Sequence, residues 1–351
     1  MKNKKLFTQI LLSWNSKENK RQMPWKGEKD PYKIWISEII LQQTRVEQGL
    51  GYYHRFIKSF PDVITLAKAD EQKVFKHWEG LGYYSRCRNL IASAKFISSQ
   101  LGGDFPKTYA SILSLKGVGT YTASAIASFA YNLPYAVIDG NVFRVLSRFF
   151  GIEIPIDTTD GKKSYANLAN ELLDKTNPGT YNQAIMDFGA TVCKPALPLC
   201  DTCPLYNKCL AFKSKKINTL PVKQKAIKRR NRFLTYVIAE YNKSFYVRRR
   251  ENSDIWRGLY EFILFENHLA SNEKEFVRSK QFDELFGTNK LEIAQISKQY
   301  LQKLTHQTIH GSFVHIRLSK ALQKNSGYHL VSREQLDLLP FPKFINSYLR
   351  D

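Results

Sequence analysis

Four of the five cysteines in this chain lie close together, and their spacing constrains the fold more than any other feature of the sequence. The spacing is C-x6-C-x2-C-x5-C, and it runs through Cys193, Cys200, Cys203 and Cys209. Four thiolates on one short loop suit a zinc ion or an iron–sulfur cluster, and the spacing alone leaves both open. A site closed by four thiolates has no free coordination position, so we expect a structural role.

The rest of the sequence favours a reducing, intracellular compartment. Cys87 stands alone, and we expect it to be a small, partly buried side chain. No uninterrupted apolar run approaches the ~20 residues of a membrane span. The opening MKNKKLFTQILLSWN is basic and then apolar, but no small-residue cleavage site follows it. We therefore expect a cytoplasmic protein, in which disulfides are the weakest interpretation of the cysteines.

The charge balance indicates a polyanionic partner. Lys and Arg number 53 against 31 Asp and Glu, which gives a formal net charge of +22. The sequence has enough hydrophobic residues to bury cores, which argues against global disorder. The alternatives are a solubility effect or affinity for an anionic membrane, and the charge favours nucleic acid over both.

The chain divides by composition into two parts of different character. Up to residue 212, apolar residues recur at the three- and four-residue spacing of amphipathic helices, as in PYKIWISEIILQQ. Residues 213–232 carry nine basic residues and no acidic one. We interpret this stretch as an exposed linker, which is either a simple tether or a strap along a phosphate backbone. Residues 233–351 read as a smaller α+β domain.

The pattern of residues 233–351 predicts both strands and helices. NRFLTYVIAEYNKSFYVRRR reads as two strands joined by a turn at Tyr241–Ser244, and SFVHIRL reads as another strand. NEKEFVRSKQFDELF and REQLDLL read as helices.

A glycine-rich turn before a helix predicts close approach to a ligand. Gly117 and Gly119 bracket Val118 and allow a tight turn, and the helix that follows presents unpaired N–H groups. A phosphate fits such a cradle, although an ordinary corner between two helices would show the same pattern. Lys116 and Thr120 flank the turn and could add phosphate contacts.

Two acidic residues, Glu38 and Asp139, stand in surroundings that suggest different roles. Glu38 lies in an apolar helix, one turn from Ile34 and Leu41, which should raise its pKa and suit it to donate a proton. Asp139 precedes GNVFRVL, where a helix N-cap is the simplest interpretation.

Five sequence blocks together resemble one family, the helix-hairpin-helix DNA glycosylases and among them the MutY-like adenine DNA glycosylases. The blocks follow in order along the chain: MPWKGEKDPYKIWISEIILQQTRV, GLGYYSRCRNL, LKGVGTYTASAI, IDGNVFRVLSR and MDFGATVC with its cysteine loop. The resemblance implies a mainly α helix-hairpin-helix glycosylase domain over residues 1–212. It also implies a [4Fe–4S] cluster on the loop 193–209 and a MutT-like (Nudix-like) α+β domain over residues 233–351.

The resemblance assigns roles to four residues of the expected active site. Glu38 matches the acid that protonates N7 of adenine. Asp139 matches the carboxylate that stabilises positive charge at C1′, and Asn141 would orient water or Asp139. Tyr121 stands where bifunctional relatives carry the lysine that attacks C1′. Because a tyrosine cannot form that Schiff base, the sequence predicts base removal without strand cleavage.

The resemblance also implies contacts with the DNA. Gln42, Gln43 and Tyr83 match residues that wedge into the duplex or contact the opposite base. The turn from Lys116 to Thr120 would bind a phosphate, and its lysine departs from the proline that is usual in the family.

The second domain is expected to recognise a lesion rather than to hydrolyse a nucleotide. DIWRGLYEFIL resembles the turn and strand of MutT enzymes, but the box G-x5-E-x7-R-E-x2-E-E is missing. Leu304, Thr305 and His306 match the Phe-Ser-His loop that senses 8-oxoguanine in relatives. Thr305 keeps the hydroxyl of serine, whereas Leu304 replaces the phenylalanine.

We therefore predict a monofunctional adenine DNA glycosylase that removes adenine paired with 8-oxoguanine or guanine. Its partner would be double-stranded DNA, and we expect a monomer associated with the nucleoid. The alternatives are a glycosylase and lyase for oxidised pyrimidines, a non-catalytic iron–sulfur DNA-binding protein, and a MutT-type nucleotide hydrolase.

Overall fold

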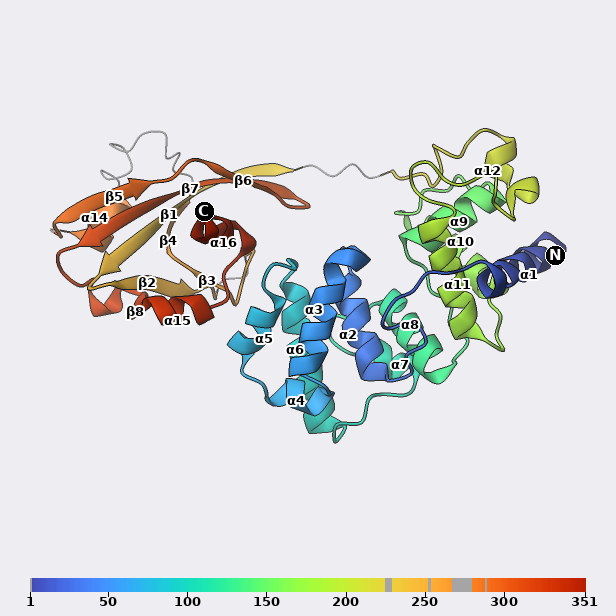
Figure 1. Cartoon of the computed structure of the whole chain (residues 1–351), viewed down its shortest axis with the longest axis horizontal. Coiled ribbons are helices and arrows are strands. Elements are labelled where there is room, and N and C mark those ends of the chain that lie inside the picture. Colours follow the sequence, from blue (N-terminus) through green and yellow to red (C-terminus); the bar gives the residue numbers. More distant parts are fainter. Residues whose placement is uncertain (1, 225–228, 252–253, 267–279, 288) are drawn as a thin grey trace. The chain divides into compact units, whose positions relative to one another are not determined.

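The computed structural model describes residues 2–224, 229–251, 254–266, 280–287 and 289–351. The chain forms two compact units. The first unit contains residues 1–68 and 89–226, and the second contains residues 69–88 and 227–351. Figure 1 shows that the first is built from helices and that the second contains a sheet.

The first unit is helical over the part of it that the structure describes. Its helices are α1 (Lys2–Lys17), α2 (Pro31–Leu41), α3 (Val46–Ser59), α4 (Val63–Lys68), most of α6 (Ser85–Gln100), α7 (Tyr109–Leu113), α8 (Thr120–Tyr131), α9 (Gly140–Phe150), α10 (Thr159–Leu172), α11 (Pro178–Thr191) and α12 (Leu210–Lys213). A short 3-10 helix, η1 (Tyr206–Lys208), precedes α12.

The start of α2 is fixed by local chemistry. The Asp30 carboxylate accepts a hydrogen bond from the backbone N–H of Tyr32 at 2.9 Å, and Pro31 occupies the first helical position. Both features favour a helix N-terminus. Nearly every residue from Tyr32 to Ile40 is buried, so this helix has almost no polar face.

The glycine-rich turn forms the connection between α7 and α8. Gly117 adopts φ +82°, and a side chain there would place its Cβ 2.6 Å from the Cβ of Asn89. The Ser93 hydroxyl donates to the backbone carbonyl of Lys116 at 3.0 Å, which anchors the turn. Gly119 is the N-cap of α8. Only glycine satisfies both the backbone angle and the close packing at position 117.

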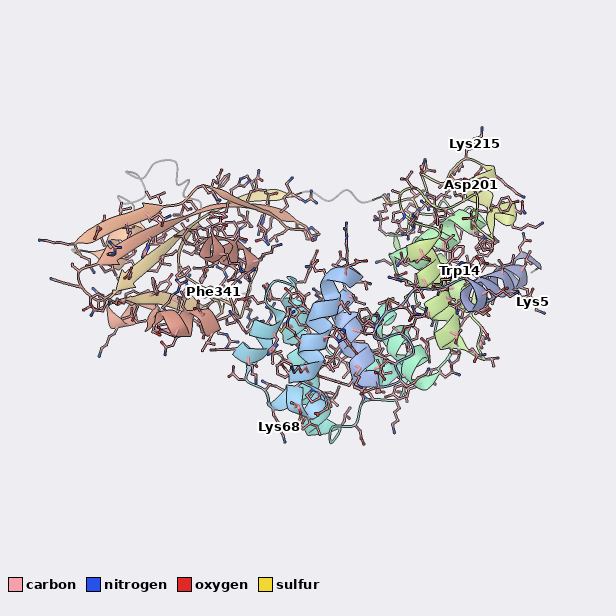
Figure 2. The ribbon with its side chains drawn as sticks, viewed as in Figure 1. Lys5, Trp14, Lys68, Asp201, Lys215 and Phe341 are labelled. Carbon is pink, nitrogen blue, oxygen red and sulfur yellow. The ribbon has the colours of Figure 1, made fainter. Side chains whose placement is uncertain are left out.

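One hydrophobic core of the first unit lies between α1, α9 and α11. Trp14 of α1, which is labelled in Figure 2, packs edge-on against Phe188 of α11, with ring centroids 5.0 Å apart. Phe7 packs against Phe149 of α9 at 4.9 Å. This core positions the N-terminus of α9 and one face of α11, and both helices contribute residues to the pocket described below.

The second unit is built around a mixed sheet. The path of hydrogen-bonded strands is β3-β2-β1-β7-β5, while β4 pairs with β1, β6 pairs with β7 and β8 pairs with β2. The strands are β1 (Arg230–Tyr241), β2 (Ser244–Arg249), β3 (Tyr260–Glu261), β4 (Ile263–Glu266), β5 (Leu291–Ile296), β6 (Tyr300–Lys303), β7 (Gln307–Leu318) and β8 (His329–Val331). The long strands β1 and β7 run parallel, and the other pairs are antiparallel.

Helices cover both faces of this sheet. On one face, Phe282 of α14 (Lys280–Phe286) packs against Phe265 and lies in a core with Val314. On the other, Phe344 of α16 (Lys343–Arg350) packs against Phe313, with ring centroids 5.7 Å apart. The unit also contains α5 (Glu71–Trp78), α15 (Arg333–Leu338) and the 3-10 helix η2 (Lys324–Ser326). The expected fold class, a mainly α part followed by an α+β part, is confirmed.

One detail differs from the sequence-based expectation. The basic stretch 213–232 was expected to be exposed, but β1 already begins at Arg230 and Arg232 is buried. Its guanidinium pairs with Asp254 at 2.8 Å and Glu266 at 2.7 Å, which no local pattern indicates. The first part of the helix expected in NEKEFVRSKQFDELF lies outside the described residues.

No helix among those residues is both long and apolar enough to span a membrane.

Candidate active site

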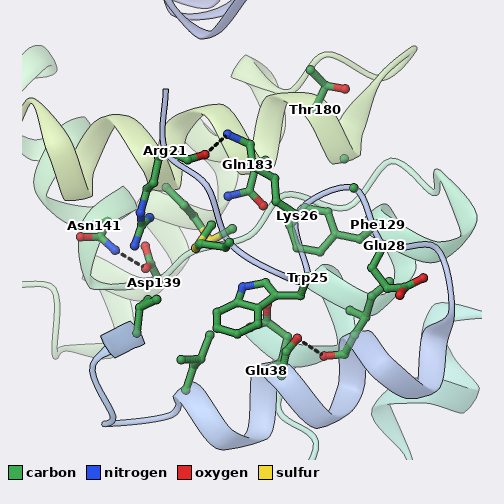
Figure 3. Close-up of a pocket in the computed structure, with 18 of the residues that line it drawn as sticks. Arg21, Trp25, Lys26, Glu28, Glu38, Phe129, Asp139, Asn141, Thr180 and Gln183 are labelled. Atoms are coloured by element: carbon green, nitrogen blue, oxygen red, sulfur yellow. Dashed lines mark hydrogen bonds between the residues drawn. The ribbon is translucent and has the colours of Figure 1, made fainter. Parts of the chain in front are cut away.

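A pocket of about 380 Å³ opens in the first unit where α2, α8, α9 and α11 meet (Figure 3). Glu38, Tyr121, Asp139 and Asn141 all line it. These residues come from three separate segments of the chain, so the fold brings together the four side chains that the sequence suggested for catalysis. Trp25, from the segment before α2, also lines the pocket.

The surroundings of Glu38 favour its protonated form. Its side chain projects from the apolar helix α2 into the pocket, and the residue is 6% exposed. Burial raises its pKa to about 7, because a carboxylate loses its hydration there. A hydrogen bond with Tyr121 acts in the opposite direction, and the negative charge of Asp139 adds to the rise.

Asp139 both caps a helix and faces the pocket. One carboxylate oxygen accepts from the backbone N–H of Val142 at 2.8 Å, which makes Asp139 the N-cap of α9. The other accepts from the Asn141 side-chain amide at 2.7 Å (Figure 3). Burial raises the pKa of Asp139, whereas these two donors favour the carboxylate. The capping interpretation is thus correct, and it leaves Asp139 exposed to the pocket.

Tyr121 of α8 lines the pocket and contacts both Glu38 and Met186. Its hydroxyl interacts with Glu38 and donates to the sulfur of Met186 at 3.6 Å. Burial and the nearby carboxylates raise its pKa well above the usual value for tyrosine, so the phenol stays neutral. A neutral hydroxyl can orient the Glu38 carboxyl but cannot act as an amine nucleophile.

Arg144 connects the pocket to the start of the cysteine loop. Its Nη2 donates to the side-chain oxygen of Asn141 at 2.8 Å and to the carbonyl of Gly189 at 2.7 Å. Its Nε donates to the carbonyl of Cys193 at 2.7 Å. Because the Asn141 amide oxygen is held in this way, its NH₂ group is directed at Asp139.

We expect Arg144→Gln to slow the reaction that the family resemblance implies by roughly 10²-fold, because the Asp139 carboxylate would lose its fixed orientation. The measurement is the single-turnover rate of that reaction beside the Kd for a duplex that carries a non-cleavable substrate analogue. The Kd should stay near that of the wild type, since Arg144 acts through Asn141. Adding Asn141→Ala should then cost little more, and full additivity of the two losses would contradict the coupling.

The structure reveals one group that sequence reasoning missed, a buried carboxylate beside the pocket. Asp187 of α11 is fully buried and accepts from Arg21 at 2.8 Å and from Lys26 at 3.1 Å. It also accepts from Asn19 at 2.9 Å and from Gln183 at 2.9 Å. Arg21, Lys26 and Gln183 line the pocket, so Asp187 fixes the polar wall opposite Glu38. The sequence signal that could have indicated Asp187 is an acidic residue within the largely apolar stretch NQAIMDFGA.

The expected DNA contacts of the first unit lie outside the lining of this pocket. Gln42 is the C-cap of α2, and its side-chain amide donates to the Thr122 hydroxyl at 3.3 Å. Gln43 follows with φ +60°, an uncommon angle for a residue with a side chain. In the turn before α8, Lys116 and Thr120 are exposed and Val118 is buried.

Two of the expected DNA contacts meet in the second unit. The hydroxyl of Tyr83 lies 2.8 Å from the hydroxyl of Thr305, although 222 positions separate them in sequence. Tyr83 is 47% exposed and has φ +47°. Thr305 and His306 form the turn between β6 and β7. The tyrosine expected to enter the duplex and the turn expected to sense the lesion therefore lie on one surface.

The four clustered cysteines line one small cavity of about 30 Å³, whose wall is otherwise apolar. Within the described residues, no three His, Cys, Asp or Glu side chains are spaced to hold a single metal ion. A [4Fe–4S] cluster binds each thiolate through a different iron, so its ligands need not gather around one point. The fold brings Cys193, Cys200, Cys203 and Cys209 together around this one cavity.

Comparisons with known proteins agree with the two-part architecture. Residues 36–174 match the family model of the HhH-GPD superfamily base excision DNA repair protein. Residues 234–351 match the model of the NUDIX domain.

Curated relatives extend the match over nearly the whole chain. The adenine DNA glycosylase of Buchnera aphidicola subsp. Acyrthosiphon pisum is 30% identical over 99% of this chain and 99% of its own. That of Buchnera aphidicola subsp. Baizongia pistaciae is 32% identical over 90% of this chain and 87% of its own. The chain belongs to the adenine DNA glycosylase family. The mouse adenine DNA glycosylase is 42% identical to this glycosylase over 59% of the chain and 42% of its own.

Solved structures agree with the helical part of the glycosylase. A thermostable thymine-DNA glycosylase covers 61% of the chain with a TM-score of 0.57 and 28% identity. Endonuclease III in a non-covalent DNA complex covers 60% with a TM-score of 0.53 and 19% identity, and supports the fold alone. The protein is thus a DNA N-glycosylase specific for adenine, and it acts in base excision repair.

Proposed function

We propose that the protein is a monofunctional glycosylase that removes adenine mispaired with 8-oxoguanine or guanine and leaves an abasic site. The observation that carries this proposal is the pairing of Glu38 with Asp139 in one pocket. One carboxyl has its pKa raised to about 7, and the other accepts two N–H donors that favour its charged form. Cleavage of a glycosidic bond needs one neutral and one charged carboxyl group.

The reaction follows from these charge states. Glu38 donates its proton to N7 of the extruded adenine, so the C1′–N9 bond breaks with its electron pair leaving on N9. Positive charge then develops at C1′, and the Asp139 carboxylate stabilises it. Water adds to C1′, and Asp139 accepts the proton that the water releases. Asn141 fixes the Asp139 carboxylate, and Tyr121 holds the Glu38 carboxyl.

The raised pKa of Glu38 predicts how activity depends on pH. The single-turnover rate should fall about tenfold per pH unit above about 7, because only the protonated acid can donate. Tyr121→Phe should move this limb to higher pH, since the hydrogen bond from Tyr121 lowers the pKa of Glu38. Rate profiles of both proteins on the same duplex test this, and an alkaline limb that does not move would contradict it.

The absence of lyase activity is proposed from Tyr121. The neutral phenol faces the pocket at the position where a lyase would need an amine. The abasic strand should therefore stay intact until alkali is added.

Recognition of the opposite base is proposed for the surface formed by Tyr83, Thr305 and His306. The contact between the two hydroxyls places the Thr305 side chain beside a ring that can stack on a base. Gln42 and Gln43 would contact the duplex near the extruded adenine. The turn from Lys116 to Thr120 would bind a backbone phosphate through the N-terminus of α8.

We further propose that the cysteine loop carries a [4Fe–4S] cluster. The ligands would be Cys193, Cys200, Cys203 and Cys209. The cluster would have a structural role, because it would fix the loop that begins at Cys193, and Arg144 donates both to the Cys193 carbonyl and to the Asn141 side chain. Iron and acid-labile sulfide in the purified protein, together with a visible absorbance band, would distinguish a cluster from zinc.

A panel of opposite bases tests the proposed specificity. Duplexes that differ only in the base facing adenine (8-oxoguanine, guanine or thymine) are incubated with excess enzyme and then treated with alkali. We expect the fastest release opposite 8-oxoguanine, slower release opposite guanine and the slowest opposite thymine. Thr305→Ala should narrow the difference between 8-oxoguanine and guanine. Equal rates on all three duplexes would refute the lesion specificity. Scission of the strand without alkali would instead support the alternative of a glycosylase with lyase activity.

A further inference from the structure

Arg148 is a buried arginine beside the cysteine loop. Within the part of the chain that the structure describes it has four hydrogen-bond acceptors, and one of them, a cysteine sulfur, can carry charge. Arg148 lies in the last turn of α9 and is 2% exposed. Its Nε donates to the Leu220 carbonyl at 3.2 Å, and its Nη atoms donate to the carbonyls of Lys194 at 2.7 Å and Pro195 at 3.1 Å. The fourth acceptor is the sulfur of Cys193, 3.5 Å from Nη1.

The Cys193 sulfur is the acceptor of Arg148 that would carry negative charge as a cluster ligand. Removing a cation from water is costly unless an opposite charge faces it, and three neutral carbonyls do not supply that charge. A deprotonated, metal-bound sulfur does. The sulfur of Cys209 lies 3.4 Å from the backbone carbonyl oxygen of Arg148, so this residue touches two of the four proposed ligands.

The neighbouring arginine makes a different contact. Arg144 lies one turn earlier on α9 and donates to the backbone carbonyl of Cys193, not to its sulfur. The two arginines therefore contact different parts of Cys193. Arg144 fixes the chain leading to the active site, and Arg148 contacts the ligand atom itself.

We propose that the charged N–H···S hydrogen bond from Arg148 to Cys193 raises the reduction potential of the cluster and protects it from oxidative loss. This inference rests on the proposed [4Fe–4S] cofactor. A charged donor withdraws electron density from a ligand sulfur and stabilises the cluster state that carries more negative charge. Hydrogen bonds to the ligand sulfurs are among the groups that set the potential of such clusters.

The test compares purified full-length wild type with Arg148→Gln, Arg148→Lys and Lys194→Gln. Each protein is assayed for iron and sulfide, for the potential of the cluster by voltammetry, and for the rate at which visible absorbance is lost in air. Lys194→Gln is the matched control, because it removes one positive charge from the same loop while leaving the Arg148 hydrogen bond to sulfur in place.

We expect Arg148→Gln to move the potential to more negative values and to bleach several-fold faster in air. A shift of about 59 mV corresponds to a tenfold change in the ratio of oxidised to reduced cluster for one electron. Arg148→Lys keeps the charge but loses the planar guanidinium. Its cluster potential and its bleaching rate should therefore lie between those of Arg148→Gln and those of the wild type. Lys194→Gln should resemble the wild type in both readouts.

An unshifted potential in Arg148→Gln, or an equal shift in Lys194→Gln, would overturn the inference. If Arg148→Gln purifies without its cluster, the test rests on Arg148→Lys. A wild-type potential and a wild-type bleaching rate in Arg148→Lys would then overturn the inference. Wild-type protein without iron would instead refute the cofactor proposal itself. The iron assay therefore separates the two failures.

Discussion

Glu38→Gln should abolish adenine excision almost completely, with a loss of about 10²–10⁴-fold in the single-turnover rate. Glutamine has nearly the same size as glutamic acid and can keep a hydrogen bond with Tyr121, but it has no acidic proton to donate to N7. We expect Asp139 not to replace it as the acid, because this carboxyl, which also lines the pocket, accepts from two N–H donors that favour its charged form. Rapid-quench assays on an adenine·8-oxoguanine duplex measure the loss.

The same substitution should make the fold more stable at alkaline pH, which separates lost chemistry from lost structure. The folded pKa of about 7 lies above the ordinary glutamate value of 4.5, so burial of Glu38 costs stability as pH rises through this interval. Above it, glutamine should recover about 3 kcal/mol, and below it the two proteins should match. Thermal unfolding across pH checks this. An inactive variant with lowered stability at every pH would point to misfolding instead.

Asp139→Asn should lower the excision rate by about 10²–10³-fold, because the charge that stabilises positive C1′ is removed. Asparagine caps helices about as well as aspartate, so α9 should keep its start and the melting temperature should change little. The substitution therefore tests the charge while it preserves the cap that the backbone N–H of Val142 requires. Single-turnover rates beside circular dichroism melts provide the comparison.

Asp139→Glu is the companion variant, since it keeps the charge but displaces the carboxylate from Asn141 and Val142. We expect it to be slow as well, because position matters as much as charge. Wild-type rates in Asp139→Asn would show that Asp139 serves only as the cap of α9, and the proposed mechanism would then need another stabiliser.

Residues whose surroundings are local could be predicted from the sequence. Glu38 lies in an apolar helix, and the structure buries it and raises its pKa as that pattern indicated. Gly117 was expected at a tight turn and has φ +82° there. The turn between β1 and β2 at Tyr241–Ser244 likewise follows from its polar residues. In each case, neighbours within a few positions determine the conformation.

Contacts between distant segments could not be predicted in this way. Asp187 is neutralised by Arg21 and Lys26, which lie more than 160 positions earlier. The contact of Tyr83 with Thr305 depends on packing within the second unit. Arg232 was placed in an exposed linker because its neighbours in sequence are basic. The structure instead pairs it with acids from later strands and loops, whose positions only the folded sheet determines.

The most direct test of the account follows both products of one reaction. Wild-type enzyme in excess acts on a duplex with adenine opposite 8-oxoguanine, and free adenine and strand scission are measured in parallel before any alkali. The account predicts that adenine appears in full while the strand stays intact, and that alkali then cleaves it at the abasic site. Strand breaks that keep pace with adenine release, or no release of adenine at all, would contradict it.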